Sequence, residues 1–290
     1  EICACLVGSE MCIRDRLTTL QMKRKNLLVF LTAACLFGCQ QQDNLQDPSK
    51  EAIDFSTSID NQSITDLLTR NSAALSLPVK NSFSTGDVIS MSVSNQDYLP
   101  FALGVDSQTW DEIDTDVESV TFYAHYPELT DEAATRALGK RYRSIKGGKE
   151  HLFGIAQAIR GTKNVALKFK RMTVPVILLD EDGRPYNGKA SIKLRLRNRG
   201  IQDLFNGKVE LDKSAEAEDI NIKKVSDGEL TNLIPQETIK AGEVIGEVSI
   251  EGEKQEIVAN QDVEVSAGNA IVMRFARNRV IFDGHTPLRR

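Results

Sequence analysis

Apolar and polar residues alternate with a period of two along much of the chain. The clearest segment is 190–197, in which an isoleucine and two leucines alternate with one lysine and two arginines. Because successive side chains of a strand point to opposite faces, this pattern predicts a strand with one buried and one wet face. Similar runs, rich in Val, Ile, Phe and Tyr, occupy 88–93, 120–126, 165–169, 174–179, 244–250 and 271–275. The pattern predicts an all-β protein.

Turn signals lie between these runs. The dipeptides Asn206-Gly207, Asp227-Gly228 and Glu251-Gly252 suit positions that need a positive φ, and residues 180–183 form another turn. Short strands joined in this way predict antiparallel sheets. Helical periodicity is weak, so residues 130–140 are expected to form one short helix or an irregular loop, and residues 200–205 a turn.

The first 51 residues indicate export. Residues 1–21 resemble translated sequencing-adapter read-through and are not expected to be part of the folded protein. From Met22, three basic residues precede an apolar run at 27–37, which is the layout of a signal peptide over residues 22–38. The run is about half of the ~20 residues that a membrane-spanning helix needs. Residues 36–39 resemble a bacterial lipobox, which predicts lipidation of Cys39, with residues 39–51 as a polar tether. The alternative is a buried N-terminal helix with a chance cysteine.

Composition narrows the possible chemistry. The chain has 290 residues, 41% of them hydrophobic, and 36 Lys plus Arg against 41 Asp plus Glu. An acidic balance disfavours nucleic acid as a partner, because phosphate binding relies on basic residues. There are three histidines, and all five cysteines lie before position 40. The sequence therefore predicts no zinc site and no disulfide within the exported part.

Four groups of residues are candidate sites. Carboxylates at 111–118 could bind calcium, but the Asp-x-Asp-x-Asp-Gly loop is missing, so a solvated turn is favoured. The basic residues at 193–199 have no interleaved aromatics and are interpreted as a wet strand face. Trp110 could stack on a sugar, although a lone tryptophan is usually core. His125 lies between tyrosines and is also interpreted as core or edge. With no Gly-x-Ser-x-Gly motif, we expect no enzyme, no cofactor and no metal.

Several strings then follow one another in a fixed order. They are Ile53-Asp54-Phe55-Ser56, Thr69-Arg70, FSTGDVI at 83–89, Trp110, FYAHYP at 122–127, VALKF at 165–169, NGKV at 206–209, LIPQ at 233–236 and VSAGN at 265–269. Preceded by a lipobox, this series over about 53–275 resembles the fimbrillin family, the lipoprotein pilins and tip or anchor subunits of anaerobic Gram-negative bacteria.

The resemblance implies two transthyretin-like antiparallel β-sandwich domains, 52–171 and 172–290. It also implies assembly by strand exchange. A protease would cut after Arg70 and release an N-terminal strand containing Ile53, Phe55 and Ile59. A C-terminal strand of another subunit, with Val280, Ile281 and Phe282, would replace it. Arg70 as an exposed loop charge is the alternative.

Two classes of function follow. The first is a fimbrial subunit, or a tip or anchor adhesin, held at the outer membrane through lipid on Cys39 and partnered by other fimbrial subunits. The second is a monomeric surface lipoprotein that binds glycan or host protein. Cleavage and polymerisation would separate them.

Overall fold

The computed structural model describes residues 50–60, 77–94, 96–113, 116–129, 141–277 and 279–285, with side chains up to residue 282. All of these residues belong to one compact unit, Gln46–Arg290. The signal peptide, Cys39, Arg70 and the expected helix or loop at 130–140 lie outside the described residues. In the part of the chain that the structure describes, no helix is long and apolar enough to span a membrane.

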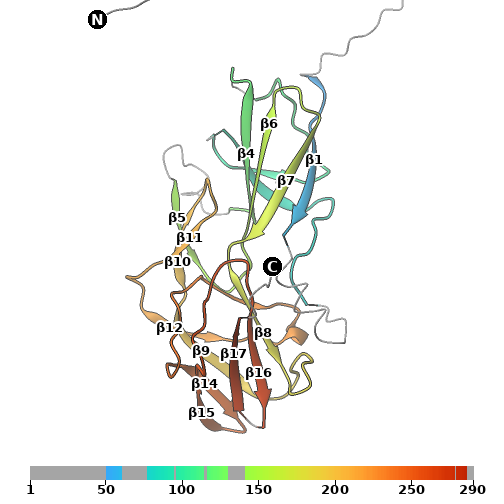
Figure 1. The fold of residues 1–290 in the computed structure, drawn as a ribbon. Coiled ribbons are helices and arrows are strands. Elements are labelled where there is room, and N and C mark those ends of the chain that lie inside the picture. The colour runs from blue at the N-terminus through green and yellow to red at the C-terminus, as the bar shows by residue number, and fades with distance from the viewer. Residues whose placement is uncertain are drawn as a thin grey trace, which may run out of the picture. The chain divides into compact units, whose positions relative to one another are not determined.

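The described residues form four sheets and one short 3-10 helix, Val225–Asp227, so the all-β class is confirmed (Figure 1). The largest sheet has the strand order β1-β7-β6-β4-β2-β3. Its strands are β1 (Asp54–Ile59), β2 (Val88–Val93), β3 (Leu99–Ala102), β4 (Ser119–Tyr126), β6 (Leu152–Ile159) and β7 (Asn164–Arg171).

The six-stranded sheet curls around one apolar core. Phe55 of β1 packs edge-on against Phe101 of β3, with ring centroids 5.4 Å apart, although these strands are the two ends of the sheet. Trp110 covers the same core and donates its indole N–H to the carbonyl of Thr162 at 3.0 Å. Arg160 donates to the carbonyl of Trp110 at 3.0 Å, which holds the tryptophan loop against the strands.

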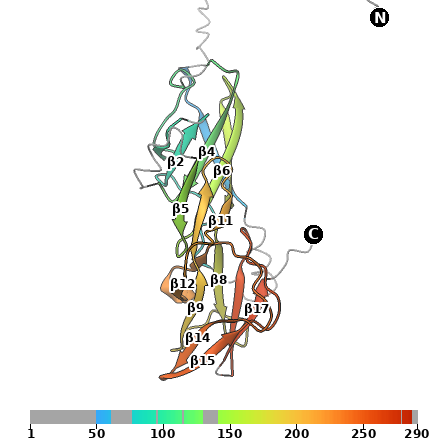
Figure 2. The same cartoon turned by 90° about the vertical axis from the view of Figure 1, so that its left-hand side faces the viewer.

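Two four-stranded sheets form a sandwich after residue 171. One has the order β12-β9-β14-β15 and the other β13-β8-β16-β17. Figure 2 shows β9, β14 and β15 together with β8 and β17 in this part of the chain. The strands are β8 (Val174–Leu179), β9 (Ser191–Arg197), β12 (Ala217–Asn221), β13 (Thr231–Leu233), β14 (Val244–Ile250), β15 (Glu253–Val258), β16 (Ile271–Ala276) and β17 (Arg279–His285). All of β8 is buried because Val176 and Leu178 face the sandwich core, while Ile177 and Leu179 pack on Leu77 behind it.

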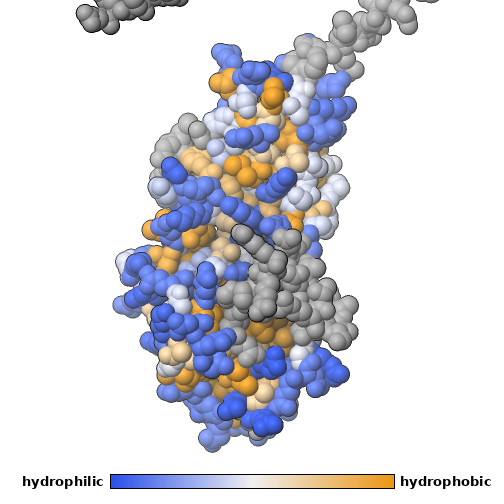
Figure 3. Space-filling model, viewed as in Figure 1, coloured by the Kyte–Doolittle hydropathy of each residue, from blue (hydrophilic) through white to orange (hydrophobic). Residues whose placement is uncertain are grey.

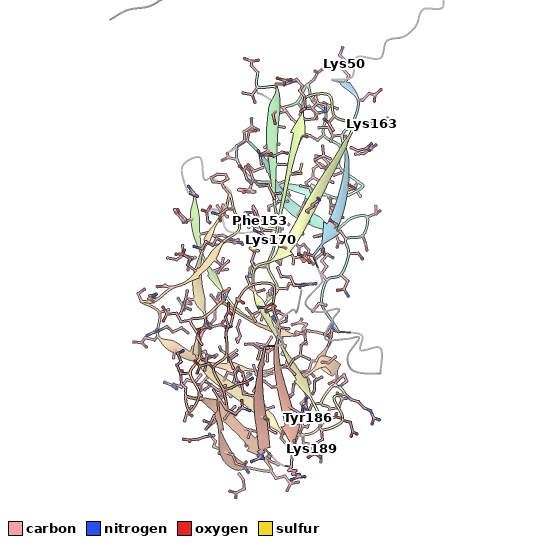
Figure 4. All side chains as sticks on the ribbon, viewed as in Figure 1. Lys50, Phe153, Lys163, Lys170, Tyr186 and Lys189 are labelled. Atoms are coloured by element: carbon pink, nitrogen blue, oxygen red, sulfur yellow. The ribbon has the colours of Figure 1, made fainter. Side chains whose placement is uncertain are left out.

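The fourth sheet has three strands, in the order β11-β10-β5. It combines β5 (Tyr142–Lys146) with β10 (Arg199–Asp203) and β11 (Val209–Leu211), so its strands come from both sides of residue 171. Ile145 and Val209 on its inner face pack with Ile234 and Phe153 in one buried cluster. Figure 4 places Phe153 beside Lys170, whose Nζ lies 6.0 Å from the ring centroid. The division into domains at residues 171 and 172 stays a prediction.

The structure confirms the strands predicted from alternation, and it corrects two expectations. Residues 200–205 do not form only a turn, because β10 extends to Asp203. The sheets are not wholly antiparallel either: β1 runs parallel to β7, and β16 runs parallel to β8. Both pairs join strands that are far apart in the sequence, where no tight turn requires an antiparallel pairing. The β14–β15 hairpin does turn through positive φ, at Glu251 (51°) and Gly252 (96°).

Candidate assembly site at strand β1

Strand β1 lies at one end of the six-stranded sheet and pairs with β7 from Asp54 opposite Asn164 to Ile59 opposite Phe169. The amide of Asp54 donates to the carbonyl of Lys163 at 2.8 Å. Lys50 and Lys163, labelled in Figure 4, lie close to where β1 and β7 begin. In a parallel pair, alternate residues direct their N–H and C=O groups to the same neighbour. Phe55, Thr57 and Ile59 therefore direct theirs to the side away from β7.

The apolar side chains of β1 close the core of the sheet. Ile53, just before the strand, is 4% exposed. Phe55 packs against Phe122 as well as Phe101, and the ring centroids of Phe55 and Phe122 are 5.2 Å apart. Ile59 is half-buried against the same core, whereas the alternate side chains of the strand are exposed. Full burial of a large apolar side chain contributes about 1.5–3 kcal/mol, so one buried and two half-buried side chains stabilise the attachment of β1 by a few kcal/mol.

The open edge of β1 is partly covered near its start. The amide of Ile53 donates to the carbonyl of Gln108 at 2.8 Å, and Ala52 forms an antiparallel bridge with Thr109. The tryptophan loop thus contacts the strand on the side opposite to β7. Beyond Ile53, β1 is the terminal strand of the sheet. Its backbone can therefore be replaced by another strand without rearranging a further neighbour on that side.

The chain from Leu77 onwards makes its own contacts with the rest of the fold, independently of β1. Leu77 is buried against Ile177 and Leu179. The guanidinium of Arg171 donates to the carbonyl of Lys80 at 2.7 Å and pairs with Glu150, and burial lowers the pKa of Arg171 to about 10, so it stays charged at neutral pH. A break between residues 60 and 77 would leave β1 attached only by non-covalent contacts.

The expected donor residues lie in β17, at the end of its sheet beside β16. Phe282 is fully buried and Val280 is buried in the core of the same chain, while Ile281 is half-buried. Phe282 also forms a parallel bridge with Ala259, which connects the two sheets of the sandwich. Donation of this strand to another subunit would remove it from its own core. The donor role stays a prediction, as do the roles of Cys39 and Arg70, which lie outside the described residues.

The candidate residues Trp110 and His125 are both buried. Trp110 is 1% exposed, which confirms its interpretation as core. His125 is buried between Tyr98 and Phe153, and its Nε2 lies 3.0 Å from the carbonyl of Leu204. Burial lowers the pKa of His125 to about 3, so the ring is neutral at physiological pH. Within the described ranges, no three His, Cys, Asp or Glu side chains gather as metal ligands.

The acidic stretch and the basic strand form local contacts. In the acidic stretch, the carboxylate of Glu112 accepts the backbone N–H of Thr109 at 2.8 Å, as in a turn. On the basic strand, Lys193 and Arg195 pair with Asp219 of the neighbouring strand at 3.3 Å. These are features of a solvated surface, and Asp114 lies outside the described residues.

Sequence reasoning missed two exposed apolar positions on the outer face of β6, Ile155 and Ile159. Figure 3 shows apolar residues over this part of the sheet. The segment 152–159 is apolar almost throughout, so its alternation is hidden. Sequence reasoning also missed Tyr142 and Ile201, which are exposed on the three-stranded sheet. A single aromatic residue in a polar stretch carries no pattern that would identify it.

Replacing Phe55 with serine is expected to lower the free energy of unfolding by about 2 kcal/mol, since the ring is only half-buried. Hydrogen exchange of the β1 and β7 amides should accelerate more than exchange in β14, because the loss is local. Ser56→Ala, on the exposed face of β1, is the matched control. Equal effects of the two substitutions on exchange would show that Phe55 does not hold the strand.

Comparison with known proteins gives the family. No family model matches the chain, and no curated protein matches it. A solved structure of a "putative cell adhesion protein" from Bacteroides thetaiotaomicron is 46% identical, with a TM-score of 0.66, and the match covers 83% of this chain and 100% of that chain. A second structure with the same description, from Bacteroides ovatus, is 17% identical over 81% of this chain and 94% of that chain, with a TM-score of 0.53.

An identity of 46% over the full length of the solved chain shows that the two proteins are members of one family. The chain belongs to the family of this Bacteroides thetaiotaomicron protein. This relationship agrees with the fimbrillin-like resemblance inferred from the ordered strings. The second structure supports the fold alone.

Proposed function

We propose that this protein is an adhesion or fimbrial subunit of the cell surface that joins other subunits through the position of β1. The observation that carries the proposal is the placement of Phe55, which enters a core lined by Phe101 and Phe122 from a terminal strand. The description of the Bacteroides thetaiotaomicron relative as a cell adhesion protein agrees with this role. No catalytic chemistry is part of the proposal.

Release of β1 would leave two kinds of unsatisfied group. The apolar side chains that pack on Ile53, Phe55 and Ile59 would be exposed to water, and the backbone groups of β7 would lose their hydrogen bonds. An incoming strand with apolar residues at alternate positions satisfies both. Val280 and Phe282 have this spacing. Cleavage after Arg70, in the segment between β1 and Leu77, would make the release possible.

The proposal includes attachment of the subunit to the outer membrane by lipid on Cys39. The lipobox-like residues 36–39 and the preceding signal-peptide layout support it. A polar tether over 39–51 would separate the lipid from the folded part.

A disulfide that locks β1 to β7 tests the strand-exchange step. Ser58 and Lys168 are register partners with exposed side chains, and neighbouring strands lie about 4.8 Å apart, within the roughly 4.4–6.8 Å that a disulfide requires between Cα atoms. The variant Ser58→Cys/Lys168→Cys, made in a Cys39→Ala background, has no other cysteine after residue 38. After treatment with an arginine-specific protease, unlocked protein should form SDS-resistant ladders on gels.

The locked protein should remain monomeric after the same cut and polymerise when a reductant is added. Arg70→Ala in the unlocked protein is the matched control for the cleavage site, and it should stay monomeric. Ladders of equal strength from the oxidised locked protein would contradict release of β1. A cut, unlocked protein that stays monomeric would favour the monomeric surface binder, an alternative that the burial of Phe282 in its own core supports.

A further inference from the structure

The outer face of the three-stranded sheet carries an exposed aromatic ring beside an exposed isoleucine. Ile201 lies opposite Ser144 on β5 and opposite Glu210 on β11, and opposite residues share a face of a sheet. Tyr142 is two residues from Ser144 and so lies on this face too. The side chains of Tyr142 and Ile201 are 58% and 45% exposed. Both line a surface cavity of about 320 Å³.

Two ion pairs form the polar walls of this cavity. Arg141 donates through Nε and Nη2 to the same oxygen of Asp203, at 2.8 and 2.7 Å, and Lys208 pairs with Glu210 at 2.7 Å. The Arg141 guanidinium carbon lies 5.5 Å from the centroid of the Tyr142 ring. Two cations and two anions leave the cavity without net charge. Such a site offers hydrogen-bond donors and acceptors and does not select an ionic ligand.

The turn between β10 and β11, which lies beside these groups, is fixed by its own hydrogen bonds. Asp203 accepts the backbone N–H of Phe205 and the side-chain N–H of Asn206, each at 2.9 Å. Asn206 in turn accepts the backbone N–H of Lys208 at 2.7 Å. The hydrogen bond and charge of Lys208 lower the pKa of Glu210, so this carboxylate stays ionised at neutral pH. A ligand therefore meets polar groups that are already placed, which reduces the entropic cost of binding.

We propose that this face binds a neutral saccharide, with a sugar ring stacked on Tyr142. A sugar ring has apolar C–H faces, which suit Tyr142 and Ile201, and an edge of hydroxyl groups, each a donor and an acceptor. The exposed parts of Arg141, Lys208 and Glu210 supply both kinds of partner. The cavity volume falls within the roughly 300–1,000 Å³ typical of small-molecule sites. A larger cavity of about 700 Å³ beside β9 has no aromatic side chain among its lining residues.

This inference goes beyond the assembly proposed above and does not depend on it. Tyr142 and Ile201 belong to the three-stranded sheet, whereas β1 belongs to the six-stranded sheet. Binding of a saccharide would give an adhesion protein a target on a glycan-coated surface. A variant that loses saccharide binding should still form ladders after cleavage, so the two proposals can fail separately.

Binding to immobilised hexasaccharides tests the inference with the purified protein. The probes are the neutral maltohexaose, cellohexaose, mannohexaose and xylohexaose, with heparin as an acidic comparison. The unmodified protein should bind at least one neutral probe, and Tyr142→Ala should weaken that binding at least tenfold. Tyr142→Phe should remain within threefold, since it keeps the ring. The matched control is Ile159→Ala, which removes an exposed apolar side chain from β6 and should change nothing.

The inference fails if none of the neutral probes binds, or if Tyr142→Ala binds as well as the unmodified protein. It also fails if Ile159→Ala loses as much binding as Tyr142→Ala, because the contact would then be non-specific. Preferential binding of heparin that depends on Tyr142 would overturn the assignment to a neutral ligand. Circular dichroism of each variant shows whether the fold is intact.

Discussion

Replacing Phe282 with alanine is expected to lower the free energy of unfolding by about 3–5 kcal/mol, because the removed ring leaves a cavity in a closed core. Phe282 is 0% exposed and belongs to the same cluster as Val176 and Leu194, which come from the two facing sheets. Urea denaturation followed by circular dichroism measures the change, with the m-value showing whether unfolding remains two-state.

The matched control is Ile281→Ala on the same strand. Ile281 is half-buried and lies opposite Arg274 of β16, so its truncation should cost about 1 kcal/mol. A loss at Phe282 no larger than that at Ile281 would contradict the packing described here. It would also mean that β17 is weakly held and free to serve as a donor. The expected large loss means that β17 can be donated only if the acceptor replaces several kcal/mol of core packing.

Alternation predicted the strands that have one buried and one exposed face. β9 is the clearest case, since Ile192, Leu194 and Leu196 all face the core. Alternation failed for β10, because residues 200–205, which begin with Gly200, were expected to form a turn. The glycine has a packing role there: a Cβ at this position would lie 2.8 Å from Cγ2 of Ile234 and 2.9 Å from the carbonyl oxygen of Glu210. The sequence shows that a glycine is present, but the close approach that requires it comes from residues 10 and 34 positions away.

The same limit applies to the candidate site. The alternation of Ile53 and Phe55 was sufficient to predict a strand with a buried face, and β1 has that pattern. Neither its partner nor its direction could be predicted. β7 lies about 110 residues further along the chain, and the parallel pairing leaves no local turn signal. The contact of Phe55 with Phe101 depends on how far the sheet curls, which is a property of all six strands together.

Stability should fall steeply on mild acidification because two histidines are held neutral inside the protein. Burial, together with the positive charge of Arg143, lowers the pKa of His125 to about 3 and that of His151 to about 4. The Nδ1 atoms of both rings are buried and accept no hydrogen bond from the described part of the chain. In the unfolded chain the pKa of histidine is about 6.5. Unfolding therefore takes up protons below pH 6.5, and the free energy of unfolding falls as the pH falls towards the folded-state values.

Each histidine contributes a slope of about 1.4 kcal/mol per pH unit between its two pKa values, so the pair should give about 2.7. Urea denaturation between pH 4.8 and 5.8 measures it in a window above the ~4.3 at which unfolded glutamates titrate. His125→Gln and His151→Gln should each reduce the slope by about half, whatever they do to stability at pH 7. The slope is the deciding quantity, because a cavity or a lost contact lowers the stability equally at every pH. An unchanged slope in both variants would show that carboxylates, and not these two rings, govern the acid response.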